Sequence, residues 1–77
     1  MKKTAVWTTS SQIKSGEYDP ETQVLTIEFV KGATYEYYDV PEFVWIELNE
    51  GFSVGKTFAR LVRGKYEYKK IFDNEEK

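Results

Sequence analysis

Ala33-Thr34-Tyr35-Glu36-Tyr37-Tyr38-Asp39-Val40-Pro41 lies at the middle of a chain of 77 residues and separates two halves of different pattern. Tyr35 and Tyr37 alternate on one face of an extended strand, whereas Tyr38 and Val40 point to the other face. Beyond the proline, the spacing of the apolar residues changes from two to about 3.6. The stretch therefore predicts a β-strand that leads directly into a helix.

Two further strands are predicted upstream of this stretch. Residues 23–30 alternate cleanly, which predicts a core face made of Leu25, Ile27 and Phe29. Lys31-Gly32 is expected to be a tight two-residue turn that joins this strand to the tyrosine strand as a hairpin. Asp19-Pro20-Glu21-Thr22 has the composition of a turn.

The first strand is predicted at residues 13–18. Ile13 and Tyr18 would fall on opposite faces of a regular pleat, so we expect a bulge at Gly16 to bring both to the same side. Residues 1–11 are expected to form an extended arm that Val6 and Trp7 pin to the body. The ends of the chain, residues 1–5 and 73–77, are expected to be flexible.

The first helix is predicted downstream of the tyrosine strand, and its start is left open between two positions. Pro41 suits the first helical position, whereas Asp39 with Glu42 resembles a capping box. The helix ends at Gly51. More than half of its circumference is apolar, which predicts burial between the sheet and the next helix. The apolar residues are Phe43, Val44, Trp45, Ile46 and Leu48.

A second helix is predicted to begin at a Ser53 cap and to end near Gly64. Its apolar stripe consists of Phe58, Leu61 and Val62. A basic stripe at i, i+4 and i+7 consists of Lys56, Arg60 and Arg63. Residues 65–72 then alternate rings and charges, as a short strand or an extended tail would.

The predicted architecture is a single α+β domain over residues 1–77. A three-stranded antiparallel β-meander is followed by two helices packed on one face, and the pattern leaves room for a short C-terminal strand. A chain of this length buries only about 60% of its unfolded surface, so its core must contain large side chains. Aromatic residues meet this need, since they make up 17% of the chain.

The composition excludes several classes of site. With no cysteine and no histidine, the chain has no disulfide, thiolate metal site, cysteine nucleophile or imidazole base. Catalysis would need Ser10 or Ser11 with a lysine, or the pair Asp39 and Glu42, and no motif surrounds either set. We therefore expect no enzymatic activity, no cofactor and no metal. No apolar run reaches the length of a signal or a membrane span, so we expect a cytoplasmic monomer without membrane contact.

The net charge of −2 conceals a strong segregation of charge. Residues 1–55 carry four lysines against nine acids, whereas residues 56–70 carry six basic residues against Glu67 alone. The last seven residues are acidic again. An acidic sheet half and a basic helical half are expected.

Four pieces of the sequence, in this order and spacing, resemble the KTSC domain family over about residues 6–71. These pieces are Ser10-Ser11-x-Ile13, then Tyr18-Asp19-Pro20-Glu21-Thr22-x-x-Leu25-x-Ile27-x-Phe29, then Tyr35-x-Tyr37-Tyr38-x-Val40-Pro41, and finally Gly55-Lys56-x-Phe58 with Arg63-Gly64-Lys65-Tyr66-x-Tyr68. The resemblance implies a small domain that is found alone in bacterial and phage proteins and at the C-terminus of some lysyl-tRNA synthetases. Attachment to a tRNA-handling enzyme implies a role in RNA binding.

Three positions depart from the pattern of that family. Ala59 stands where Asn is common, Leu61 where His or another polar residue is common, and Glu67 where Pro is common. The first two departures argue against a polar site on the second helix that is shared by the family. The basic residues are unaffected.

Two functional hypotheses follow. The first is a noncatalytic module for RNA or single-stranded nucleic acid, with cations at the phosphates and tyrosines stacking on unpaired bases. Its candidate residues are Lys56, Arg60, Arg63, Lys65, Tyr66, Tyr68, Lys69, Lys70 and Tyr38. The competing interpretations are a solvated helix face for the cations and core packing for Tyr66 and Tyr68. For Tyr35 and Tyr37 we expect core positions beside Leu25 and Ile27, which leaves Tyr38 as the exposed ring.

The second hypothesis is a protein-protein interaction module, such as an accessory or phage-type factor that acts on a host protein. Its surface would be the acidic face of the sheet around Glu28 and Glu36, or an edge strand open to pairing. Plain solubility is the competing interpretation of these acids.

Overall fold

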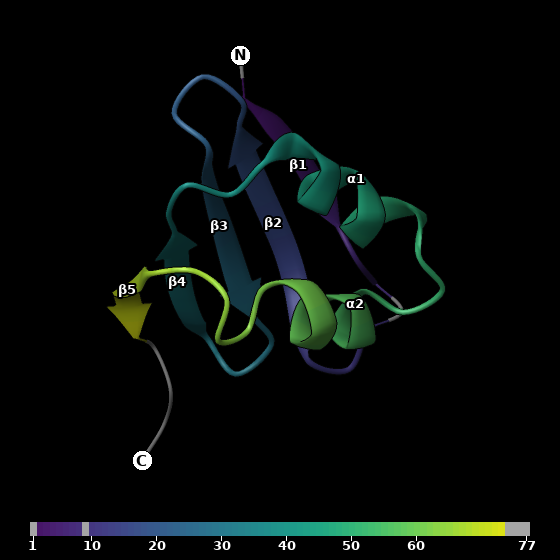
Figure 1. The fold of residues 1–77 in the computed structure, drawn as a ribbon. Coiled ribbons are helices and arrows are strands. Elements are labelled where there is room, and N and C mark those ends of the chain that lie inside the picture. Colours follow the sequence, from purple (N-terminus) through teal and green to yellow (C-terminus); the bar gives the residue numbers. More distant parts are fainter. Residues whose placement is uncertain (1, 9, 74–77) are drawn as a thin grey trace.

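The fold is a five-stranded antiparallel sheet with two helices on one of its faces (Figure 1). This computed structural model describes residues 2–8 and 10–73. The elements are β1 (Lys3–Val6), β2 (Ile13–Asp19), β3 (Val24–Phe29), β4 (Ala33–Tyr37), α1 (Glu42–Glu50), α2 (Val54–Leu61) and β5 (Tyr68–Asp73). The strands lie in the order β1-β2-β3-β4-β5.

The predicted α+β class and the placement of the helices on one face are confirmed, but the sheet is wider than predicted. The central meander β2-β3-β4 is present as predicted. Strand β1 extends the sheet beyond β2, and strand β5 extends it beyond β4. Residues 3–6, which were expected to lie in an extended arm whose first five residues are flexible, pair with residues 15–18 as β1. Only Ala5 of this strand contacts the core, so its apolar pattern was too weak to reveal it.

The C-terminal strand that the sequence left open is present as β5, which pairs antiparallel with β4. Its register places Tyr68 opposite Tyr37 and Lys70 opposite Tyr35. Asp73 is the last residue of the strand, and the remaining residues that were expected to be flexible, 74–77, lie outside the described part of the chain.

The bulge in β2 lies at residues 13–15 and not at Gly16 as predicted. It does bring Ile13 and Tyr18 to the same face, where both are fully buried. Gly16 serves a different purpose, because the ring of Trp7 packs against it and leaves no room for a Cβ atom. Trp7 thus anchors the N-terminal arm as expected, whereas Val6 is 69% exposed.

The turns follow the sequence with one difference. Asp19 accepts the Gln23 N–H on its carbonyl and the Glu21 N–H on its Oδ1, which confirms the first turn. The β3-β4 hairpin loop contains three residues, Val30 to Gly32, and not the two predicted. Gly32 has a φ of 108°, and its N–H donates to the Phe29 carbonyl.

Helix α1 begins at neither of the two predicted positions. Pro41 precedes the helix as its N-cap, and no side-chain hydrogen bond caps this end. Asp39 has a φ of 57°, so it forms a sharp turn in place of a capping box. Val40 holds this turn against the body, because its carbonyl accepts the buried Tyr18 hydroxyl at 2.6 Å and its N–H donates to Gln23.

The prediction that α1 is covered on most of its surface is wrong. Val44, Trp45 and Leu48 are buried, but Phe43 is 57% exposed and Ile46 is 43% exposed. The helix packs on the sheet and beside α2, and no third layer covers its outer side (Figure 1). Helix α2 is capped by Ser53 as predicted, since Ser53 Oγ accepts the Lys56 N–H at 3.3 Å.

Candidate functional site: a basic surface beside an aromatic groove

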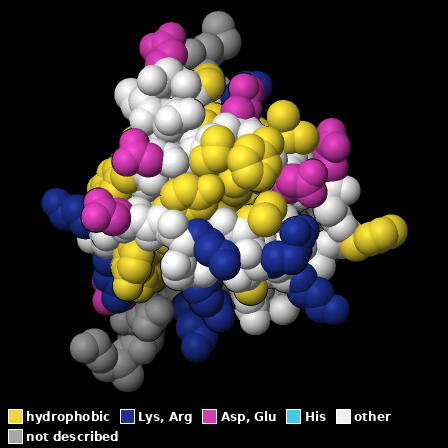
Figure 2. Space-filling model, in the orientation of Figure 1, with side chains coloured by type: hydrophobic (Ala, Val, Ile, Leu, Met, Phe, Trp, Pro, Cys, Tyr) yellow, Lys and Arg dark blue, Asp and Glu magenta, His cyan; other side chains and the backbone are white. Residues whose placement is uncertain are grey.

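The basic surface consists of four exposed side chains on α2 and in the turn that follows it, namely Lys56, Arg60, Arg63 and Lys65. Figure 2 shows Lys and Arg side chains gathered over this part of the molecule, below an area of hydrophobic side chains. Phe58 and Val62 fix the orientation of this surface, because both are buried on the opposite side of the same segment. The predicted amphipathic pattern is thereby confirmed.

The cations of the basic surface differ in their partners from three of the four lysines of the acidic half. Among the described residues, no ion pair joins any of the four to a carboxylate. The three N-terminal lysines, Lys2, Lys3 and Lys14, all have carboxylate partners, at 3.0, 2.6 and 3.7 Å. The charge of the basic surface is therefore available to an anionic ligand.

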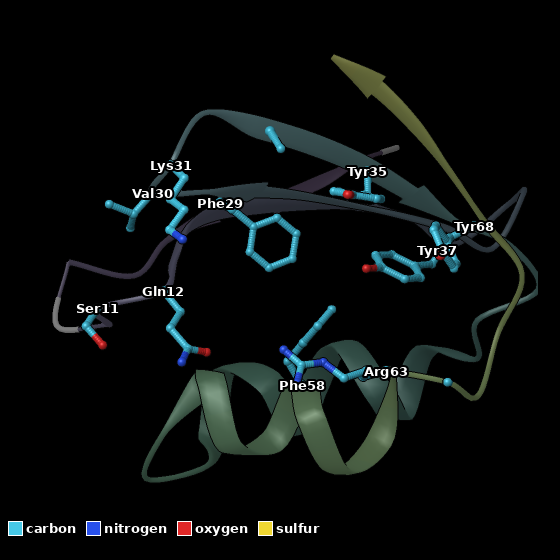
Figure 3. A pocket seen from close by; sticks show the side chains of 12 residues that line it. Ser11, Gln12, Phe29, Val30, Lys31, Tyr35, Tyr37, Phe58, Arg63 and Tyr68 are labelled. Atoms are coloured by element: carbon cyan, nitrogen blue, oxygen red, sulfur yellow. The ribbon is translucent and has the colours of Figure 1, made fainter. Parts of the chain in front are cut away.

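A groove of about 840 Å³ lies between the sheet and the end of α2 (Figure 3). We call it the aromatic groove. Its aromatic and charged lining is Phe29, Tyr35, Tyr37, Phe58, Arg63, Tyr68 and Lys31. Ser11, Gln12, Val30, Ala33 and Gly64 complete it. Phe29 and the three tyrosines project from the sheet, and Phe58 and Arg63 face them from the side of α2 (Figure 3).

Tyr35 is the centre of the aromatic wall. Its ring meets Phe29 edge-on with centroids 5.6 Å apart, and the ring of Tyr68 lies at the same distance, tilted by 54°. Lys70 Nζ lies 5.7 Å from the centroid of Tyr35. Tyr35 is only partly buried, so it lines the groove at the edge of the core instead of filling the core as predicted. Tyr37 is a core residue, as predicted, and is 7% exposed.

The two tyrosines of the C-terminal segment have different environments. Tyr66 is partly buried and packs against the core, whereas Tyr68 is 60% exposed at the groove. The difference follows from the pairing of β5 with β4, which places Tyr68 beside Tyr37.

The structure does not bring all nine candidate residues together. Lys69 pairs with Glu36 across β4 and β5, on the face of the sheet turned away from the helices. The Tyr38 hydroxyl donates to Glu36 Oε1 at 3.0 Å on that same face. Tyr38 and Lys69 are thus separated by the sheet from the aromatic groove, while Arg63, Tyr68 and Lys70 surround it.

Several groove residues were not identified from the sequence as site residues. Phe29, Phe58, Gln12 and Lys31 come from four separate segments that meet only in the folded chain. The alternating pattern of Leu25, Ile27 and Phe29 correctly placed Phe29 on the core face of its strand. No sequence signal showed that the helix stops short of covering it.

The acidic face of the sheet is neutralised in part by ion pairs within the domain. Glu17 pairs with Lys2 and Glu28 pairs with Lys14, and Glu28 also accepts the Ser15 hydroxyl at 3.1 Å. Such exposed pairs contribute little to stability, but they reduce the field that a basic partner would meet.

One of the two serines considered for catalysis has a structural role. Ser10 Oγ accepts the N–H groups of Gln12 and Ile13, which is the role of a turn residue. No cluster of three metal-binding side chains occurs in the described part of the chain. Within residues 2–8 and 10–73, neither helix is long and apolar enough to cross a bilayer.

The sequence of this chain is similar to a protein-family model and to several known proteins. The family model described as the KTSC domain matches residues 9–66. A lysine–tRNA ligase of Nostoc sp. is 41% identical over 61 residues, which are 79% of this chain and 11% of the ligase. A protein of Stutzerimonas stutzeri is 41% identical over 63 residues and is covered over 89% of its length. This chain thus spans about a tenth of the ligases that it matches.

A solved structure has the same fold. The crystal structure of a KTSC domain protein from Yersinia pestis superimposes with a TM-score of 0.82 at 33% sequence identity. The match covers 92% of this chain and 99% of the other.

Proposed function

This chain belongs to the KTSC domain family, and from that premise we propose that it is a noncatalytic module for single-stranded nucleic acid, RNA in the first place. The basic surface would contact phosphates, and the aromatic groove would accept bases. RNA is recognised most often through unpaired bases that stack on aromatic or guanidinium planes. Both kinds of group are present here side by side.

The observation that carries the proposal is the position of Arg63. This side chain belongs to the basic surface and also lines the aromatic groove opposite the tyrosines (Figure 3). A strand that follows α2 with its phosphates would therefore pass the mouth of the groove. Electrostatic contacts that track a backbone next to a stacking platform are typical of proteins that bind single strands.

The distribution of ion pairs supports the same proposal. The four cations of the basic surface have no carboxylate partner among the described residues, whereas Lys2, Lys3 and Lys14 do. A lysine that is already paired must give up its carboxylate to contact a phosphate, whereas an unpaired cation loses no ion pair when it neutralises a phosphate and releases counterions. The basic surface is thus the part of this acidic protein best suited to a polyanion.

The relatives add an independent argument. Among them are lysine–tRNA ligases, enzymes whose name states that tRNA is their substrate. The chain corresponds to about a tenth of such an enzyme, so we propose for it an accessory contact with RNA and not the ligase reaction.

The lining of the groove supports a binding role over a catalytic one. Its described residues include tyrosine, serine, glutamine, lysine and arginine but no carboxylate, histidine or cysteine. Burial raises the pKa of Tyr37 from 10.0 to about 12, so this hydroxyl stays protonated at neutral pH and is a poor base.

Fluorescence anisotropy with labelled single-stranded RNA at several salt concentrations tests this proposal. We expect log affinity to fall with log salt by about 0.7 for each phosphate contact. Replacing Arg60, Arg63 and Lys65 together by Ala should weaken binding and flatten this slope by about 2. The control is a triple Ala variant of Lys2, Lys3 and Lys14, which makes the same change in net charge away from the basic surface.

Two results would contradict the proposal. One is absence of binding at low salt for both single-stranded RNA and tRNA. The other is an equal loss of affinity in the two triple variants, which would show that only net charge matters.

Protein binding remains a second candidate, and a specific observation moves it from the acidic sheet face to α1. Phe43 and Ile46 lie three residues apart on this helix, are about half exposed, and stand next to the exposed acid Glu47. We propose a partner with apolar residues flanked by basic ones. A stoichiometric partner that is captured by the wild type but not by a Phe43→Ser variant would support this candidate, and equal capture by both would contradict it.

A further inference from the structure

We propose that the aromatic groove is the site for one unstacked base of the bound strand, with guanine preferred. The base would stack on the exposed ring of Tyr68 with the tilted ring of Tyr35 beside it, and its acceptor edge would face Tyr37 and Arg63. This inference rests on the proposed function and specifies which part of the nucleic acid the groove takes.

The hydroxyl of Tyr37 is the first observation that points to a ligand. The residue is only 7% exposed, yet no hydrogen bond joins its hydroxyl to any group in the described part of the chain. In Figure 3 this hydroxyl points into the groove between Phe29 and Arg63. The other deeply buried tyrosine, Tyr18, donates to the Val40 carbonyl at 2.6 Å. The hydroxyl oxygen itself is not enclosed, because no buried side-chain oxygen in the described chain lacks a hydrogen-bond partner. It is therefore open to the groove and can donate to a ligand there.

The aromatic wall is the second observation. Tyr35 is held from two sides by Phe29 and Tyr68, while the wall that they form remains open to the groove. Tyr68 keeps 60% of its surface exposed on an edge strand, so its ring is accessible to a ligand. A planar base that covers these rings removes that apolar surface from water. The groove volume of about 840 Å³ is ample for one nucleotide.

The polar groups of the groove select the edge of the base. Arg63 carries only donors, and the Tyr37 hydroxyl is a donor that has no competing acceptor within the described protein. Guanine presents the adjacent acceptors O6 and N7 to such a set, whereas adenine places an amino donor beside N7. The donors of Tyr37 and Arg63 therefore favour guanine over adenine at their end of the groove. Gln12, whose amide could pair with adenine, lies towards the other end (Figure 3). The same contacts leave the sugar and phosphate outside, near the basic surface.

The test uses octamers of uridine with a single change at the centre, which is guanosine, adenosine or an abasic ribose. Fluorescence anisotropy with the full chain should give about tenfold tighter binding for the guanosine octamer than for the abasic one, with adenosine between them. All three should share one salt slope, because their phosphates are identical.

Two variants separate the stacking from the edge contact. Tyr68→Leu should reduce the affinity for both purine octamers several-fold and leave the abasic octamer unchanged. Tyr37→Phe keeps the ring and removes only the hydroxyl, so it should reduce the preference for guanosine over adenosine, with Arg63 left as the remaining donor. Thr26→Val is the matched control, because it also removes one hydroxyl but lies opposite Glu36 on the face turned away from the groove, and it should change none of these affinities.

The outcomes distinguish the inference from the proposed function. Equal affinity for the guanosine and abasic octamers, or a guanosine preference of unchanged size in Tyr37→Phe, would overturn the inference while the module still binds RNA. Absence of binding for all three octamers would overturn both.

Discussion

The indole ring of Trp7 lies directly against Gly16, so closely that a Cβ at residue 16 would come within 2.6 Å of Trp7 Cη2. The same indole meets Trp45 of α1 with centroids 5.8 Å apart and donates from Nε1 to Asn49 Oδ1 at 3.1 Å. One side chain thus joins the N-terminal arm, β2 and α1. The position of the indole ring therefore requires a residue without a Cβ atom at position 16.

Gly16→Ala should lower the free energy of unfolding by about 1–3 kcal/mol, because the new methyl group displaces the indole. In a Trp7→Ala background the same substitution should cost much less, since the space is already empty. Urea unfolding of the four proteins, followed by circular dichroism, measures the coupling. Additive effects of the two substitutions would show that the contact does not constrain residue 16.

Tyr18→Phe should lower the free energy of unfolding by about 1–3 kcal/mol. The substitution removes a buried donor and leaves the Val40 carbonyl without its 2.6 Å hydrogen bond, next to the sharp turn at Asp39. Chemical denaturation measures the change. Tyr66→Phe is the control, and a loss of equal size in both variants would argue against the role assigned to the Val40 contact.

Ser53→Ala should cost about 1 kcal/mol of stability, because the Lys56 N–H at the start of α2 loses its acceptor. Ser53→Asp keeps an acceptor at the cap and should restore most of the loss. Thermal unfolding of the three proteins provides the comparison. If the Asp variant is no more stable than the Ala variant, the cap contributes nothing through this hydrogen bond.

Stability should decrease as the pH rises from about 10 to about 12. Burial raises the pKa of Tyr37 from 10.0 to about 12, so the unfolded chain releases this proton at a lower pH than the folded chain. The stabilisation that comes from keeping Tyr37 protonated is fully present below pH 10. It is lost as the pH rises towards the pKa of Tyr37 in the folded protein, which is about 12. Tyr37→Phe should flatten the decrease without abolishing it, because burial also raises the pKa of Tyr18.

Denaturant midpoints of both proteins across this pH range measure the effect. An identical pH dependence in the wild type and in Tyr37→Phe would contradict it. Titration of tyrosinate absorbance in the folded protein gives a direct check, since Tyr37 should ionise among the last of the tyrosines.

Local patterns predicted much of the fold. The alternation in residues 23–30 identified Leu25 and Ile27, which are fully buried, and the Ser53 signal identified the cap of α2. Elements with few apolar residues were harder to predict. Strand β1 directs only Ala5 towards the core, and β5 is exposed along its whole length, so pairing and not burial defines both.

The candidate site was predicted only in part, for a related reason. Periodicity along one helix is enough to place Lys56, Arg60 and Arg63 on one exposed stripe. It gives no information on which strand edge the chain returns to after Gly64. The pairing of β5 with β4 put Tyr68 and Lys70 beside Tyr35, and it put Lys69 and Tyr38 on the far face.

The sequence by itself determined the α+β class, the central meander, the two helices, the segregated charge and the resemblance to the family, because each depends on residues close together in the chain. Only the tertiary structure decided that the sheet has five strands, that α1 leaves Phe43 and Ile46 exposed, and that a groove opens between Tyr35 and Arg63. These features depend on contacts between distant segments. Their energies come from strand pairing and from the way α2 packs, and no local spacing of residues records either.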